Sequence, residues 1–171
     1  LANDIVGNLQ TWDTFNRNAR MVFASKEAFR YVHQNNVPIE NWPYRDITLN
    51  VYFFYPNCIL LVDQAGVDIL KMYPNANDPA KSKTYHSYYL RPEIVEQMQK
   101  QGRNEAGESR FEGFNKIVVD EDYAAAETVQ AGASSGAQDH YIFGKNEPAL
   151  QHYHNTHREA LGLAPLEALV S

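Results

Sequence analysis

Residues 47–56 read ITLNVYFFYP, and residues 58–64 read CILLVDQ. Both segments are rich in β-branched and aromatic side chains, which is typical of strands. The Pro56-Asn57 pair between them is a turn signal. After Gly66, the segments VDILKMYP at 67–74 and KTYHSYYL at 83–90 predict two more strands, separated by a polar loop. Connections this short join antiparallel neighbours, so the sequence predicts an antiparallel meander.

The sequence after this meander predicts helices. Pro92 stands where a helix would begin, and PEIVEQMQKQ at 92–101 follows helical spacing. Residues 104–130 are mainly helical in propensity, and AGASSGA at 131–137 predicts a flexible break. Strands followed by helices indicate an α+β domain, and 171 residues suffice for one such domain.

Two further helices are predicted outside this region. KEAFRYVHQNN at 26–36 predicts a short helix, and the rest of the first forty residues gives mixed signals. NEPALQHYHNTHREALG at 146–162 predicts a terminal helix with Asn146 as its N-cap and Gly162 as its end. Its apolar stripe predicts that it packs on the sheet. The stripe consists of Ala149, Leu150, Tyr153, His157, Ala160 and Leu161.

Composition excludes several classes of protein. The net charge is −6, with acidic and basic residues interspersed, which argues against a nucleic-acid partner. No apolar run approaches the roughly 18–20 residues that span a bilayer, so no membrane association is expected and a cytoplasmic location is the default. Cys58 is the single cysteine, so the chain has no internal disulfide and no cysteine-based zinc or iron–sulfur site.

An acidic run at 118–130, VVDEDYAAAETVQ, raises the question of a metal site. Spacing alone favours a helix start in which Asp120 or Asp122 is the N-cap and Glu121 interacts with the helix dipole. The alternative is that one carboxylate ligates a cation. On an α-helix Asp122 and Glu127 lie on different faces, so the pair is poorly placed to share one site.

The histidines give a weaker signal. His152, His154 and His157 form an HxHxxH pattern in the terminal helix, and surface or interface roles are expected rather than metal binding. The other three are isolated in the sequence, and structural roles are expected for them: His33, His86 and His140.

Two stretches resemble the C-terminal part of the α subunit of Rieske-type ring-hydroxylating oxygenases. One carries that family's D-x4-E-x2-Q arrangement, a break of small residues, and a G-x-x-E lead-in to a terminal helix. Its elements here are Asp122, Glu127, Gln130, Gly144 and Glu147. The other, VYFFYPNCILLVDQAGVDILKMYPNANDP at 51–79, resembles the family's hairpin and following strand, and Arg91-Pro92-Glu93 follows in family order. The resemblance extends from about residue 47 onward.

This resemblance implies a helix-grip fold (Bet v 1-like or START-like), with an antiparallel sheet around long C-terminal helices. It also implies a mononuclear Fe(II) held by two histidines and one carboxylate, an arrangement that leaves positions open for O2. Asp122 matches the family's carboxylate ligand. Electrons come from a Rieske [2Fe–2S] cluster, and ultimately from NAD(P)H through a reductase or ferredoxin. The implied activity is O2-dependent hydroxylation in aromatic compound catabolism.

The resemblance also implies that parts of the oxygenase lie elsewhere. One cysteine cannot hold the Rieske cluster, and the family places its two iron histidines upstream of the strands. We therefore expect this chain, as a single domain over 1–171, to be the C-terminal portion of an α subunit that is inactive alone. The family assembles as homotrimers or α3β3 complexes. The alternatives are a stand-alone helix-grip module that binds an apolar ligand without iron, and an assembly domain.

The resemblance finally suggests which residues contact substrate. Alternate residues on the two strands that flank the Pro56 turn line the family's pocket, which corresponds here to Leu49, Val51 and Leu61. Phe114 and Val118 lie on the approach to Asp122. These apolar positions predict an aromatic or hydrophobic substrate, with ordinary core packing as the alternative for each residue.

Overall fold

A computed structural model describes residues 5–103 and 106–167. The chain divides into two compact units, and each is treated by itself. The sheet unit comprises the described residues up to 73, residues 83–89, and those from 143 onward. The helical unit comprises residues 74–82 and 90–142.

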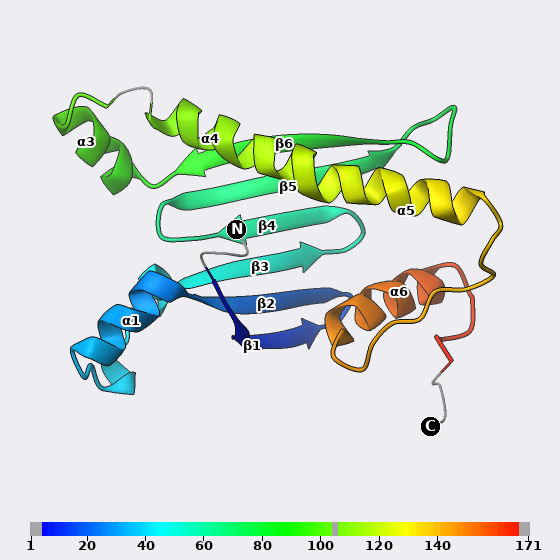
Figure 1. Ribbon diagram of the computed structural model, residues 1–171, viewed down its shortest axis with the longest axis horizontal. Coiled ribbons are helices and arrows are strands. Elements are labelled where there is room, and N and C mark those ends of the chain that lie inside the picture. The colour runs from blue at the N-terminus through cyan, green and yellow to red at the C-terminus, as the bar shows by residue number, and fades with distance from the viewer. Residues whose placement is uncertain (1–4, 104–105, 168–171) are drawn as a thin grey trace. The chain divides into compact units, whose positions relative to one another are not determined.

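The sheet consists of six strands in sequence order (Figure 1). They are β1 (Ile5–Phe15), β2 (Asn18–Ser25), β3 (Thr48–Phe54), β4 (Cys58–Val62), β5 (Gly66–Pro74) and β6 (Ser82–Leu90). The registers from β1 through β5 are antiparallel throughout. The predicted α+β class is therefore confirmed, and β3 to β6 are the four strands that the sequence predicts.

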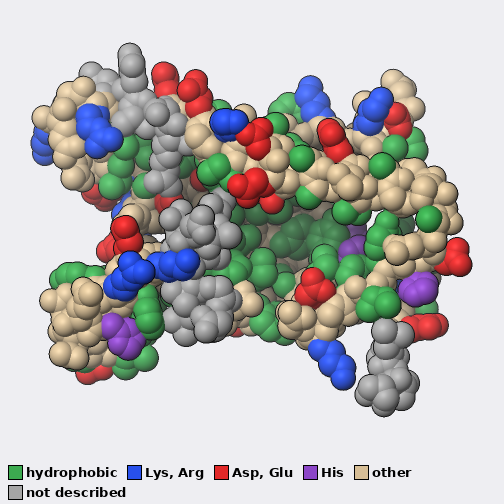
Figure 2. Space-filling model, in the orientation of Figure 1, with side chains coloured by type: hydrophobic (Ala, Val, Ile, Leu, Met, Phe, Trp, Pro, Cys, Tyr) green, Lys and Arg blue, Asp and Glu red, His purple; other side chains and the backbone are tan. Residues whose placement is uncertain are grey.

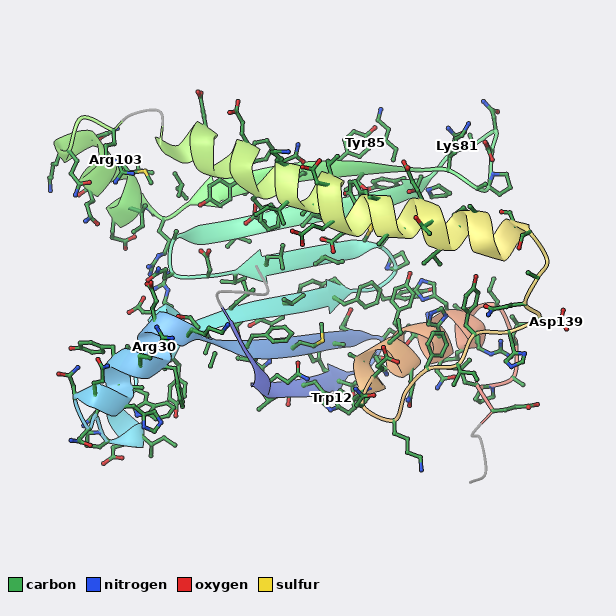
Figure 3. The ribbon with its side chains drawn as sticks, in the orientation of Figure 1. Trp12, Arg30, Lys81, Tyr85, Arg103 and Asp139 are labelled. Atoms are coloured by element: carbon green, nitrogen blue, oxygen red, sulfur yellow. The ribbon has the colours of Figure 1, made fainter. Side chains whose placement is uncertain are left out.

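The β1–β2 hairpin is the part of the sheet that the sequence analysis does not predict. Asn16 adopts a left-handed conformation (φ 57°) at the turn, which a short polar side chain tolerates better than most. The register is interrupted between Val6 and Gln10. Trp12 on β1 and Tyr85 on β6 mark the two edge strands in Figure 3.

Side chains from the turns fix the connections between the central strands. Asp63 Oδ1 accepts hydrogen bonds from the backbone N–H groups of Ala65 (2.7 Å) and Gly66 (3.0 Å), which closes the β4–β5 turn. Asn18 Oδ1 accepts one from the Tyr55 N–H at 3.0 Å, which ties β2 to the β3–β4 turn. That turn contains a cis bond between Tyr55 and Pro56.

Helices join this sheet at two places. The predicted helix near residue 26 is confirmed as α1 (Lys26–Gln34), and it contacts β2 and the short α2 (Tyr44–Ile47). A 3-10 turn (Ile39–Asn41) precedes α2. Val32 on α1 is 1% exposed, so this helix supplies one of the best-buried apolar side chains of the unit.

The terminal helix α6 (Pro148–Ala160) packs against β1 and β2. Its contact face differs from the predicted stripe, because Leu150 and Leu161 are exposed and Thr156 is buried at 4%. Tyr153 keeps an aromatic contact with Phe53 on β3, with ring centroids 4.8 Å apart. Helix packing on the sheet was predicted correctly, but the buried residue of the helix is the polar Thr156, which lies outside the predicted stripe.

The ends of α6 show why its flanking residues matter. Glu147, not Asn146, is the N-cap, and its Oε2 accepts the Gly144 N–H at 2.6 Å. Gly162 has a φ of 67°, and the N–H of the next residue bonds to the Arg158 carbonyl at 2.8 Å. This is a Schellman motif, for which glycine is the preferred residue. Gly162 therefore ends the helix as predicted.

Replacing Glu147 with alanine should lower the stability of the sheet unit. The change removes the acceptor of the Gly144 N–H, and a hydrogen bond to a charged group contributes about 1–3 kcal/mol. We expect a loss of about 1 kcal/mol in chemical denaturation followed by circular dichroism, because the site is exposed. Glu167→Ala is the control and should change stability by less than about 0.5 kcal/mol. Equal effects of the two changes would contradict a stabilising role for the Glu147–Gly144 hydrogen bond.

The helical unit contains α3 (Pro92–Lys100), α4 (Ala106–Ile117), a π-helical segment (Val118–Tyr123) and α5 (Ala124–Ser134). The last three follow one another without a gap in Figure 1. The predicted helix start at Asp120 or Asp122 is therefore wrong, because both acids lie within a continuous helical stretch. The break predicted at 131–137 begins later, since α5 extends to Ser134 and Gly136 is the left-handed residue (φ 67°).

None of the helices within the described residues is long and apolar enough to span a bilayer.

Candidate functional site

Asp122 lies in the π-helical segment between α4 and α5. A π-turn inserts an extra residue into a helix and re-aims the side chains around it, and such segments are frequent at functional sites. Val118 begins the segment and is buried at 6%, whereas Asp122 is exposed. The segment thus combines an apolar anchor with an accessible carboxylate.

The neighbouring acids are not equivalent. Asp120 forms an ion pair with Lys116, four residues earlier, and the hydrogen bond to Asp120 raises the pKa of Lys116. The Asp122 side chain takes part in no hydrogen bond or ion pair within the part of the chain that the structure describes. Of these two aspartates, only Asp120 forms an ion pair with a neighbouring lysine among the described residues.

The predicted substrate residues separate into two subsets. Phe114 is half-buried on α4, and Val118 follows it by one helical turn, so the two share the approach to Asp122. Leu49, Val51 and Leu61 belong to the sheet unit and are all half-buried. The structure brings each subset together within its own unit.

The sheet subset lies on one face. Cross-strand partners in direct register are Met21 with Val51, Val51 with Leu61, and Leu61 with Asp68. Because side chains alternate along each strand, Leu49 shares this face with Val51. We call it the Val51 face. Figure 2 shows hydrophobic side chains gathered over the middle strands of the sheet.

A polar pair that the sequence analysis missed lies on the Val51 face. His86 on β6 and Asp68 on β5 have Nε2 and Oδ1 2.7 Å apart, and each side chain is only 10% exposed. His86 was expected to have an isolated structural role. The alternating pattern of β5 and β6 was the available signal, since it places both residues on the inward side.

The histidines of α6 occupy three different environments, and none is fully exposed. His152 is half-buried, and its buried Nε2 has no hydrogen-bond partner among the described residues. His154 stacks on Phe143 with ring centroids 4.6 Å apart, and burial, followed by the nearby His157 and Arg158 charges, lowers its pKa. His157 bonds through Nδ1 to the Tyr153 carbonyl at 2.9 Å.

His152 and His157 are spaced H-x4-H, which is the spacing that the resemblance implies for the iron histidines, but they lie in the terminal helix rather than ahead of the strands. Within the described part of the chain, no three His, Cys, Asp or Glu side chains are grouped so that they could hold a metal ion. Asp122 alone supplies one ligand. The described residues therefore do not by themselves fit a mononuclear iron centre.

Comparison with known families decides how this arrangement is interpreted. The model of the ring hydroxylating alpha subunit (catalytic domain) matches residues 3–163. The chain belongs to this family. Comparisons with curated proteins and with solved structures found no match.

The family match extends the resemblance seen in the sequence. It begins at residue 3, so the β1–β2 hairpin and α1 belong to the catalytic domain, although the motifs indicated the family only from about residue 47. It also includes Asp122 and the terminal helix up to Gly162. The predicted family is thereby confirmed, and an oxidoreductase of the ring-hydroxylating kind is the function class that it supports.

Proposed function

We propose that this catalytic domain is part of an oxygenase α subunit that hydroxylates an aromatic or hydrophobic compound with O2 at a mononuclear Fe(II). The family match over residues 3–163 is the observation that carries the proposal. Asp122 would be the carboxylate ligand of the iron, as the family resemblance implies. Two histidines outside the strands and helices described above would complete the ligand set, and a Rieske cluster would supply electrons from NAD(P)H through a reductase or ferredoxin.

Two features of the helical unit support this role for Asp122. Its side chain is exposed and takes part in no local ion pair among the described residues, so no bond of that kind must be broken before it binds a cation. It also lies in a π-turn, whose geometry differs from that of the α-helices on either side. A hard anionic oxygen ligand suits Fe(II) and offsets part of its charge.

Substrate contacts are proposed for each unit by itself. In the sheet unit, Leu49, Val51 and Leu61 would offer aliphatic surface to the substrate, and in the helical unit Phe114 and Val118 would do so. The full protein would assemble as a homotrimer or an α3β3 complex, as the family resemblance implies.

Oxygen consumption by two preparations tests the proposal. The 171-residue chain, supplied with Fe(II), reductase, ferredoxin, NADH and an aromatic substrate, should consume no O2 above the background of the electron-transfer proteins. An α subunit that carries this segment together with the Rieske domain and the histidine pair should couple O2 uptake to hydroxylated product. Turnover by the chain alone would contradict the shared ligand set. A longer subunit that binds iron and oxidises no aromatic compound would contradict the function.

A further inference from the structure

The segment that leads into α6 folds back onto the helix. Phe143 stacks on His154, with ring centroids 4.6 Å apart and 27° between the ring planes. Gln151 Nε2 donates a hydrogen bond to the Gly144 carbonyl at 2.7 Å. We call residues 143–147, which these contacts hold on α6, the latch. Its aromatic contact involves an imidazole, the side chain whose ordinary pKa lies closest to neutral pH.

The latch lies where the chain enters the sheet unit, since Phe143 is the first residue of the last segment of that unit. Beyond the latch, α6 packs against β1 and β2, and its Tyr153 contacts Phe53 on β3. Phe53 follows Val51 by two residues and therefore shares the Val51 face. The latch thus fixes the start of the helix that contacts this face.

The nearest charges to His154 are positive. His157 and Arg158 follow it by three and four residues, which places them on the same side of α6. Burial, and then these two neighbours, lower the pKa of His154 below its ordinary value of about 6.5. In the latch, Lys145 is exposed, and the Glu147 carboxylate accepts a backbone N–H. A proton on His154 is therefore partly removed from water and lies near the permanent charge of Arg158.

The elements packed against α6 do not offset this charge. The described side chains of β1, β2 and β3 on the helix side of the sheet are uncharged. Asp13 and Arg20 pair with each other on the other side, because side chains alternate along each strand. Arg17 in the β1–β2 turn pairs with Glu159 at 3.3 Å. In the segment after α6, Glu167 is exposed.

We propose that the latch is a proton-sensitive switch, in which neutral His154 holds Phe143 and the lead-in on α6, and a proton taken up by His154 loosens them. The pKa of His154 is lower with the latch closed than in the open chain. The stabilisation by the latch is therefore fully present above about pH 6.5 and is lost as the pH falls through the lowered value. This device goes beyond the proposed oxygenase function and does not depend on it.

An NMR titration of the 15N-labelled 171-residue chain between pH 7.5 and 5.5 tests the switch. We expect the His154 ring to titrate below about pH 6.5. The Gly144 amide and the Gln151 side-chain amide should shift with the same midpoint, because both belong to contacts of the latch. Solvent exchange of the Gly144 N–H, corrected for its intrinsic pH dependence, should rise about 2- to 10-fold by pH 5.5, since one linked proton changes the opening equilibrium at most tenfold per pH unit.

Two variants separate the switch from a structural contact. His154→Phe keeps an aromatic ring against Phe143 and cannot take up a proton, so the exchange of Gly144 should change by less than about 1.5-fold over this range. Phe143→Ala removes a ring that helps to bury His154, so the His154 midpoint should move up toward its ordinary value. His33→Phe is the matched control, because His33 also contacts a ring, that of Phe29 at 4.4 Å on α1, and this change should leave the latch signals unaltered.

Three results would overturn the inference. They are a rise in Gly144 exchange that persists in His154→Phe, latch amides that shift without the His154 midpoint, and a His154 midpoint that Phe143→Ala does not raise. Circular dichroism at each pH adds a fourth, since unfolding of the whole chain over this range would contradict a local switch. None of these measurements involves iron, O2 or substrate, so their outcome is separate from that of the oxygenase proposal.

Discussion

An α subunit carrying Asp122→Ala should lose its mononuclear iron and its oxygenase activity. The change removes one of three proposed protein ligands, and no hydrogen bond or ion pair of Asp122 among the described residues is lost with it. Altering only the outer partners of a metal ligand typically costs roughly 10- to 100-fold in affinity or activity, so we expect a loss of more than about 100-fold here. Iron per subunit, measured by mass spectrometry of the purified protein, and O2 uptake coupled to product are the two measurements.

Asp120→Ala is the matched control. Both aspartates are exposed and lie two residues apart in the same π-helical segment, but Asp120 is paired with Lys116. Its loss removes only an exposed ion pair, and such pairs contribute little to stability. Iron content and activity should stay within about twofold of the unchanged protein, because no metal ligand is altered.

Iron content in the two variants shows whether Asp122 or Asp120 is the ligand. Loss of iron in the Asp120 variant, with iron retained in the Asp122 variant, would move the ligand by two residues. Retention of full iron and activity in both variants would remove this segment from the metal site. Circular dichroism of both variants separates these results from unfolding.

The central sheet was predictable because its strands carry their own signals. β3 is a run of β-branched and aromatic residues, the Pro56-Asn57 and Gly66 breaks bound the strands, and short loops force antiparallel pairing. The terminal helix was predictable for the same reason, since Pro148 and Gly162 mark its two ends. These signals are local, and each lies within a few residues of the feature that it determines.

β1 was missed because its signal is not local. IVGNLQTWDTF mixes polar and apolar residues, and as an edge strand it is held mainly by the backbone register with β2. Its turn uses Asn16 and Arg17 instead of the Asn-Gly pair that marks a hairpin most strongly. Backbone pairing with β2 stabilises this strand, whose own composition does not predict it.

The helix start predicted at the acidic run 118–130 was wrong for a different physical reason. Acids at a helix start and acids inside a helix look the same in a short window, and the N-cap interpretation assumed an end that does not exist. The family motif singled out Asp122, whereas helix propensity could not. A π-turn has no sequence signature of its own, so the geometry at Asp122 became visible only in the structure.

Asp68 and His86 were missed because they lie eighteen positions apart and meet only through the β5–β6 pairing. An isolated histidine gives no sign of its partner. This pair yields the second large effect. His86→Leu should lower the free energy of unfolding by about 3 kcal/mol, because it removes a donor from a carboxylate that is only 10% exposed. Asp68→Leu should cost less, about 1–2 kcal/mol, since it removes the hydrogen bond without leaving a buried carboxylate behind.

The double variant Asp68→Leu/His86→Leu decides what the pair contributes. If aliphatic side chains fill the same space as well as the pair does, its stability should return to within about 1 kcal/mol of the unchanged chain or exceed it. Urea denaturation followed by circular dichroism measures all four members of this cycle. Asp13→Leu/Arg20→Leu on the opposite face is the exposed control, and it should change stability by less than about 1 kcal/mol.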